Sequence, residues 1–208
     1  MLSIQEREIA ITIINALVEY GLTDHLAQYG EHCTEDWFYH NKLSRLGFGA
    51  SGGATKSCIW HNDLENWVIK VAHTVHVKHN YATIEYENYI KACEAGLARY
   101  FPETWCLGTF GGQVFYIQQR CDCDEGQVSS DWYERLRDEY DEEGTEYDVD
   151  CLWDEIDAMD DYEKAMLMFQ DRELCDFLWH NDIGDLHEGN FGYLRGCPVI
   201  VDFSGFKG

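Results

Sequence analysis

Three polar residues near the end of the chain have types and spacing that suit proton transfer beside a divalent cation. Asn190 follows Asp185 by five residues, and Asp202 follows a short apolar run. A carboxylate such as Asp185 can accept the proton of an attacking hydroxyl group. Asn190 and Asp202 offer the oxygen ligands that Mg²⁺ prefers. Since Asp, Asn and Gly are also common turn residues, a polar loop without chemistry is the alternative interpretation.

Two short strands are expected between these polar residues. Residues 191–194 and 198–201 are apolar, and they flank the turn Arg195-Gly196-Cys197. This pattern predicts a hairpin. Because a hairpin returns the chain to its starting point, we expect Asn190 and Asp202 at the same end of it.

A glycine-rich string is a candidate for contact with phosphate groups. Gly47, Gly49 and Gly52 match G-x-G-x-x-G. With strands expected on both sides, the string predicts a flap whose backbone N–H groups cover phosphates. The dinucleotide-binding turn, which opens a helix, fits less well, and Thr55 before Lys56 excludes a P-loop. An ordinary glycine hairpin remains the alternative.

One lysine lies within a segment that should be a buried strand. Lys70 belongs to the apolar run 68–71. It needs an anionic partner there, because an unpaired buried charge is costly. Glu85 and Glu87 in the following helical segment are candidates. We favour Glu85, since Tyr89 one turn later supplies an apolar neighbour, but Glu87 stays open. A snorkelling lysine on an edge strand is the alternative.

Three histidines recur at every third position after this strand. His73, His76 and His79 could be imagined as metal ligands at that spacing. A solvated loop is the expected interpretation.

Periodicity and turn signals predict the elements that position these residues. Ser3 and Glu6 form a capping box, and Gly21 is a stop signal, so a helix is expected between them. The remaining predicted helices cover 23–30, 34–40, 81–97, 131–140, part of 149–159, and 162–179. The predicted strands cover 43–48, 55–60, 67–72, 105–110 and 113–119.

The chain is strongly acidic. It has 39 Asp or Glu against 15 Lys or Arg and a net charge of −24, of which residues 121–176 carry −18. This balance disfavours direct binding of nucleic acid or anionic membranes and favours basic protein partners. The nine cysteines are scattered and odd in number, which indicates a reducing compartment. No signal peptide or membrane span is evident, so we expect a soluble, cytoplasmic protein.

The order of these motifs resembles the protein-kinase-like superfamily over about residues 43–206. The resemblance implies an α+β, two-lobed fold. Its N-lobe, residues 42–120, would have a five-stranded antiparallel sheet and one helix, with a hinge at Arg120-Cys121. Residues 121–208 would form a truncated, acidic, mainly helical C-lobe, and residues 1–41 would form an N-terminal helical extension.

The resemblance also implies an ATP- and Mg²⁺-dependent phosphotransferase. Asp185 would be the base, and Asn190 and Asp202 would hold the metal and the nucleotide. Lys70 would contact the phosphates, and Glu85 would position Lys70. The three glycines of the string would form a lid over the nucleotide. The chain is similar to minimal phage-encoded early serine/threonine protein kinases, which implies a protein substrate in the host cytoplasm.

Several positions depart from the usual pattern of that superfamily. Ala54 replaces a valine after the glycine-rich turn, and Gly184 replaces the arginine linked to control by a phosphorylated activation loop. Only six residues follow Asp202, so we expect no activation segment. His187 resembles the equivalent residue of aminoglycoside and choline kinases, which makes a small-molecule kinase a third hypothesis. The second is a kinase-like binding protein whose acidic lobe captures a basic protein or mimics DNA.

Overall fold

The computed structural model describes residues 1–29, 34–52, 55–73, 79–122, 169–184, 186 and 190–205. The chain divides into two compact units. The first comprises Met1–Lys91 and Pro102–Arg120, and the second comprises Ala92–Phe101 and Cys121–Gly208. The helices predicted over 131–140 and 149–159, with most of the acidic segment, lie outside the described residues.

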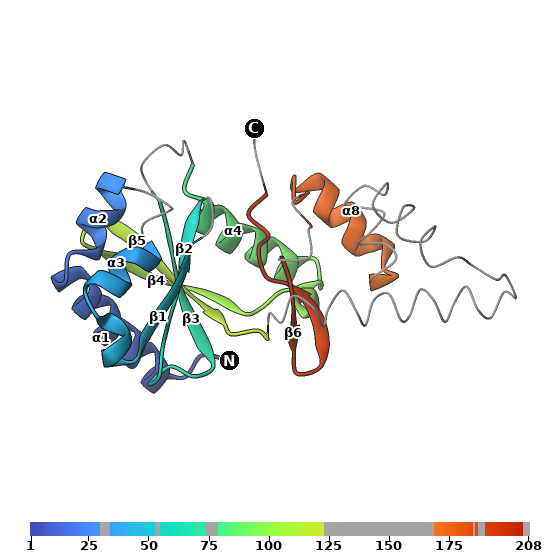
Figure 1. Ribbon diagram of the computed structural model, residues 1–208. Helices are drawn as coiled ribbons and strands as arrows, with labels where there is room; N and C mark the ends of the chain where they lie inside the picture. The colour runs from blue at the N-terminus through green and yellow to red at the C-terminus, as the bar shows by residue number, and fades with distance from the viewer. Residues whose placement is uncertain are drawn as a thin grey trace, which may run out of the picture. The chain divides into compact units, whose positions relative to one another are not determined.

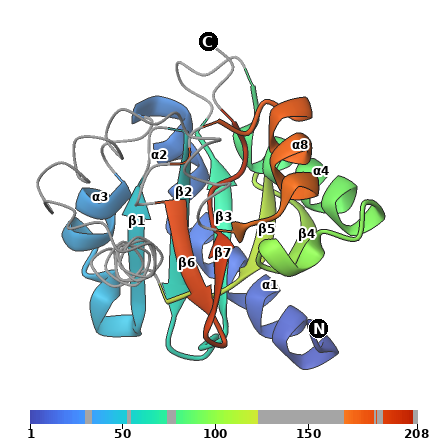
Figure 2. The same cartoon turned by 90° about the vertical axis from the view of Figure 1, so that its right-hand side faces the viewer.

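A five-stranded antiparallel sheet forms the centre of the first unit, as predicted (Figure 2). The strand order is β1-β2-β3-β5-β4, and each neighbouring pair is antiparallel. The central strand β3 is buried along its whole length. The strands are β1 (Phe48–Gly52), β2 (Lys56–His61), β3 (Trp67–Ala72), β4 (Thr104–Phe110) and β5 (Gln113–Gln119).

The segment before β1 differs from the prediction of a strand over residues 43–48. Leu43–Leu46 is the 3-10 helix η2, with Leu43 buried and Leu46 exposed. Gly47 ends η2 with a φ of +89°, a left-handed conformation that glycine adopts without a steric penalty. The strand therefore starts only at Phe48, and Gly49 lies inside it.

Three helices precede the sheet: α1 (Ile4–Glu19), α2 (Leu22–Tyr29) and α3 (Thr34–His40). The predicted capping box of α1 is confirmed. The Ser3 hydroxyl accepts a hydrogen bond from the Glu6 backbone at 3.2 Å, and the Glu6 carboxylate accepts one from the Ser3 backbone at 2.8 Å. Gly21, at a φ of +90°, follows the helix as its stop signal.

These helices lie against one face of the sheet (Figure 1). The alternation of side chains along each strand sends every second residue to that face. Helices and sheet thus share one hydrophobic core, so residues 1–41 are part of the first unit. Its fully buried side chains include Ile14, Leu17, Leu22, Leu26, Ile59, Ile69, Phe115 and Ile117.

The other face of the sheet packs against α4 (Tyr81–Glu94). The Thr83 hydroxyl and the Tyr116 hydroxyl of β5 share a hydrogen bond of 2.7 Å, and the rings of Tyr86 and Tyr116 are 5.4 Å apart. Asn80 caps the helix by accepting a hydrogen bond from the Thr83 backbone at 3.0 Å. The helix ends earlier than predicted, because Gly96 turns the chain at a φ of +75°.

The second unit contains α8 (Arg172–His180), the 3-10 helix η3 (Ala98–Tyr100) and the strands β6 (Phe191–Leu194) and β7 (Cys197–Ile200). The side chain of Asp171 caps α8 by accepting from the Leu174 backbone at 3.2 Å. It also accepts hydrogen bonds from the Tyr100 hydroxyl and, at 2.8 Å, from the Arg99 guanidinium. These bonds, above all that from Tyr100, lower the pKa of Asp171.

β6 and β7 form the predicted hairpin, with Phe191 paired to Ile200. Arg195 and Gly196 both have positive φ, at 55° and 80°, as a two-residue type I′ turn requires. β7 begins at Cys197, one residue earlier than expected. The hairpin therefore has a tight turn at one end and the polar residues at the other.

Candidate functional site

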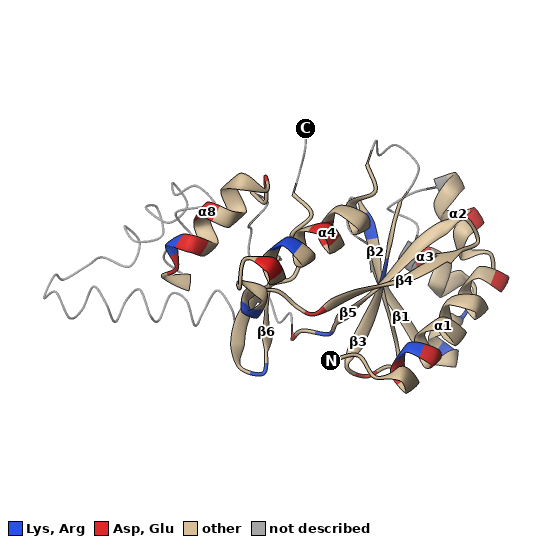
Figure 3. Ribbon diagram, turned by 180° about the vertical axis from the view of Figure 1, so that it is seen from behind, with Lys and Arg blue, Asp and Glu red and all other residues tan. Residues whose placement is uncertain are grey.

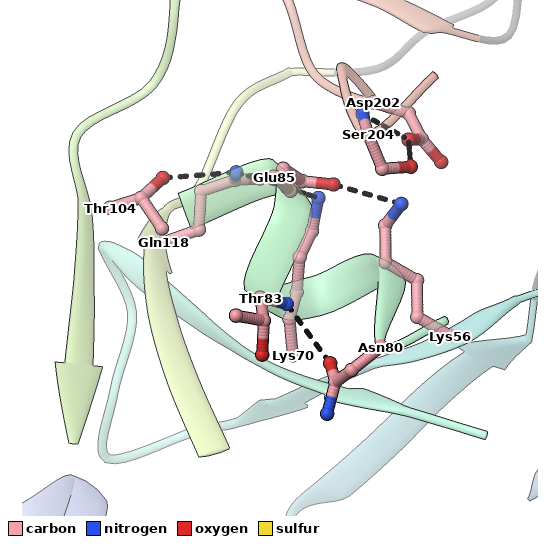
Figure 4. A network of polar contacts seen from close by, with 9 residues as sticks. All are labelled: Lys56, Lys70, Asn80, Thr83, Glu85, Thr104, Gln118, Asp202 and Ser204. Atoms are coloured by element: carbon pink, nitrogen blue, oxygen red, sulfur yellow. Dashed lines mark hydrogen bonds and ion pairs between the residues drawn. The ribbon is translucent and has the colours of Figure 1, made fainter. Parts of the chain in front are cut away.

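Lys70 and Glu85 form a buried ion pair in the first unit (Figure 4). Lys70 lies in the middle of β3, and its Nζ atom is 2.5 Å from Oε1 of Glu85 on α4. Glu87 is exposed on the same helix. The choice of Glu85 as the partner of Lys70 is thereby confirmed.

Alternation along the strands explains why Lys70 meets α4. Ile69 and Val71 belong to the core beneath the N-terminal helices, so Lys70 points to the opposite face. There Gln118 of β5 fixes Glu85 further. Its amide nitrogen donates to Oε1 of Glu85 at 2.6 Å and to the Thr104 hydroxyl at 3.1 Å.

A second lysine, Lys56, also binds Glu85. Its Nζ atom is 2.8 Å from Oε2 of Glu85, the carboxylate oxygen that Lys70 does not use. Sequence reasoning considered Lys56 only to exclude a P-loop. The register explains its place in the cluster, because Lys56 is two residues from Cys58, and Cys58 pairs across the strands with Lys70. Both lysines therefore project from the same face of the sheet.

The three charged groups are deeply buried for ionic side chains. Lys56, Lys70 and Glu85 are 5%, 7% and 1% exposed. Lysine and glutamate are almost never buried to this extent unless they are paired. Figure 3 marks the single basic residue of β2, Lys56, in blue and the acidic residues of α4 in red. Two ammonium groups beside each other suit an anionic ligand such as phosphate.

Local structure explains why glycine is required at two positions of the glycine-rich string. Gly47 adopts the left-handed conformation that ends η2. Gly49 pairs with Trp60, and a Cβ atom on Gly49 would lie 2.3 Å from the indole ring. Gly52 is the last residue of β1. The string was predicted to be the turn between two strands, but Gly49 and Gly52 lie within β1, and residues 53–54 between β1 and β2 lie outside the described residues.

Of the three histidines, His73 departs from the expectation of a solvated loop. His73 is buried, and its Nε2 atom shares a hydrogen bond of 2.7 Å with the Ser57 hydroxyl. The His73 backbone donates to Thr55 at 2.9 Å and so extends the pairing of β2 and β3. His79 is exposed, and His76 lies outside the described residues. Within the described ranges, no three His, Cys, Asp or Glu side chains form a potential metal site.

Asn190 and Asp202 lie at the open end of the β6–β7 hairpin in the second unit, as predicted. The Val201 backbone donates to the Asn190 carbonyl oxygen at 2.9 Å, and Asp202 is the next residue. The Ser204 hydroxyl donates to Oδ1 of Asp202 at 3.0 Å, which orients that carboxylate. An amide oxygen and a carboxylate fit Mg²⁺, which takes few protein ligands and keeps waters and phosphate oxygens.

Asp185 and His187, the predicted base and its neighbour, lie outside the described residues. The residues before them are well defined. The Ile183 and Asp182 backbones donate to Leu178 and Trp179 at 2.9 and 3.2 Å, which is a Schellman end for α8.

Gly205 lies against this Schellman end. A Cβ atom on Gly205 would be 2.2 Å from the Asp182 carbonyl oxygen. Asp182 and Gly205, which flank the segment that contains Asn190 and Asp202, therefore lie close together.

A scan against protein-family models and a search of curated proteins found no match to this chain. Among the described helices, none is long and apolar enough to cross a membrane. The six cysteines that the structure describes are all free thiols.

Proposed function

We propose that this chain is an ATP- and Mg²⁺-dependent phosphotransferase with a two-lobed, kinase-like fold. More specifically, we propose a minimal serine/threonine protein kinase of the phage-encoded type that acts on host proteins in the host cytoplasm. The observation that carries the proposal is the buried pair of Lys70 and Glu85 behind the glycine-rich β1–β2 hairpin. Asn190 and Asp202, which share one end of a second hairpin, add the expected oxygen ligands.

In this mechanism Lys70 binds phosphate oxygens of ATP, and Glu85 holds the Lys70 side chain in place. Asn190 and Asp202 would hold Mg²⁺, which neutralises charge on the phosphates when it is bound. The backbone of the glycine-rich hairpin covers the phosphates. Asp185 accepts the proton of the acceptor hydroxyl as that oxygen forms its bond to the γ-phosphorus. The bond from the γ-phosphorus to the bridging oxygen breaks, and ADP leaves.

The decisive experiment incubates the protein with γ-labelled ATP, Mg²⁺ and a bacterial lysate. Wild type is compared with Asp185→Asn, and Asp202→Asn serves as the metal-site variant. We expect labelled protein bands with wild type and none with either variant. Label confined to metabolites would favour the small-molecule kinase. Wild type that neither labels a substrate nor binds millimolar ATP would refute the proposal.

A second candidate function is a binding protein on a kinase-like scaffold. It is favoured by the charge of −18 in residues 121–176, which suits a basic host protein or imitates the charge of DNA. Capture of basic proteins by a chain that binds no ATP would support this candidate. Salt should weaken such binding steeply, since it depends on long-range charge.

A further inference from the structure

We propose that Lys56 is a second phosphate-binding lysine and that Glu85 holds Lys56 and Lys70 together as a two-lysine clamp for the polyphosphate of the nucleotide. This inference deepens the proposed function and rests on it. The resemblance to kinases assigns one lysine to this task, and the geometry points to two.

The sheet register brings the two lysines to one carboxylate. Lys56 pairs with Ala72 and Cys58 pairs with Lys70, so the lysines lie on adjacent strands and on the same face. Each takes its own oxygen of Glu85, Oε2 for Lys56 at 2.8 Å and Oε1 for Lys70 at 2.5 Å. Because one carboxylate spans both contacts, it fixes the positions of the two ammonium groups relative to each other.

Lys56 also lies at a position of the β1–β2 hairpin that suits contact with phosphates. It is the first residue of β2 and directly follows the turn that joins β2 to β1, whereas Lys70 lies in the middle of β3. Because Lys56 and Lys70 contact the two oxygens of one carboxylate, a chain of phosphates that contacts Lys70 lies within reach of Lys56. An ammonium group has three N–H donors, so a lysine held by Glu85 retains the geometry to bind phosphate oxygens.

A structural role alone accounts poorly for a second buried lysine. Lys70 already neutralises Glu85, and Gln118 donates a further hydrogen bond to the same carboxylate at 2.6 Å. Lys56 places a second ammonium group on the same carboxylate, in a chain with only 15 basic residues against 39 acidic ones. Since the overall charge repels a polyanion such as ATP, a local cationic site is needed to bind it.

The test compares the affinities of ATP, ADP and adenosine, measured by titration calorimetry with Mg²⁺. Lys56→Met should weaken ATP binding about 10- to 100-fold, the range expected when a hydrogen bond to a charged group is lost. Adenosine affinity should change less than about twofold, since adenosine has no phosphate. Lys91→Met, which removes an exposed lysine of α4, is the matched control and should leave ATP affinity unchanged.

Lys56→Gln keeps a donor for Glu85 but loses the charge, and it replaces Lys56→Met if that variant does not fold. It should show the same loss, confined to phosphorylated ligands. Unchanged ATP affinity in a folded variant would overturn the clamp and leave the proposed function standing. Equal losses for ATP and adenosine would assign Lys56 a purely structural role and overturn the clamp as well. Wild type that binds neither ATP nor ADP would refute both proposals.

Discussion

Replacing Glu85 by glutamine should destabilise the first unit strongly. Glu85 is 1% exposed, accepts hydrogen bonds from Lys70 and Gln118 at 2.5 and 2.6 Å, and forms an ion pair with Lys56 at 2.8 Å. A glutamine offers one acceptor oxygen, so its NH₂ group would face one of the ammonium groups, donor against donor. Removing one partner of a buried charge pair costs about 3–5 kcal/mol. We therefore expect Glu85→Gln to lower the free energy of unfolding by about that amount.

Urea denaturation at neutral pH, followed by circular dichroism, measures the effect of Glu85→Gln. With a slope of about 2 kcal/mol/M, the midpoint should fall by about 2 M. Glu87→Gln changes an exposed residue of the same helix and should stay within about 0.5 kcal/mol of wild type. If Glu85→Gln costs no more than Glu87→Gln, the buried cluster does not exist as described.

An apolar replacement of the whole cluster separates stability from binding. The triple variant Lys56→Met, Lys70→Met, Glu85→Leu should recover most of the lost stability, because well-packed apolar groups often replace buried ions at no cost. It should bind no ATP. A triple variant that still binds ATP would contradict the assignment of the lysines to phosphate.

Two further predictions concern the second unit. Gly205→Ala should lower the free energy of unfolding by at least about 2 kcal/mol, because it combines a φ of +70° with a clash against a backbone carbonyl oxygen. Gly196→Ala, at a φ of +80° in open space, should lower it by only about 1–2 kcal/mol. Equal losses in thermal melts would contradict the close contact at Gly205. Asp171 accepts a hydrogen bond from Tyr100 that lowers its pKa, so its stabilising effect should be complete above the unfolded pKa of about 3.9 and should disappear as the pH falls through the lower folded value. The difference in urea midpoint between wild type and Asp171→Asn should therefore shrink below about pH 4; a difference that does not change with pH would contradict this role of Asp171.

Local sequence signals predicted most of the sheet and, within the buried cluster, the pair of Lys70 and Glu85. Strands β2 to β5 and helix α4 begin within one residue of their predicted positions, because alternation and glycine turns act over short stretches. Lys70 was assigned a partner because a lysine in an apolar strand requires one. The apolar neighbour Tyr89 favoured Glu85 as that partner, although Glu87 stayed open until the structure showed the pair.

The errors arise where non-local packing decides the structure. Residues 43–48 were predicted as a strand, but Leu43 and Leu46 are three residues apart, which is the repeat of a 3-10 helix and not of a strand, and Leu43 is buried in the shared core. Lys56 looked like an ordinary polar position at the start of a strand. Its role emerges only from the register that aligns Cys58 with Lys70. His73 was assigned to a loop because its partner, Ser57, belongs to the neighbouring strand.

The strand order has a consequence for synthesis of the chain on the ribosome. β3 receives its second neighbour, β5, only after α4 and β4 have been made, about forty residues later. At a synthesis rate of roughly 5–20 residues per second, one edge of β3 stays unpaired for roughly 2 to 8 seconds. During that interval the apolar faces of α1 to α3 also lack two of the five strands of the sheet that covers them. A nascent chain that stalls before Gln113 should therefore be a substrate for chaperones, because it presents both an open strand edge and an uncovered core.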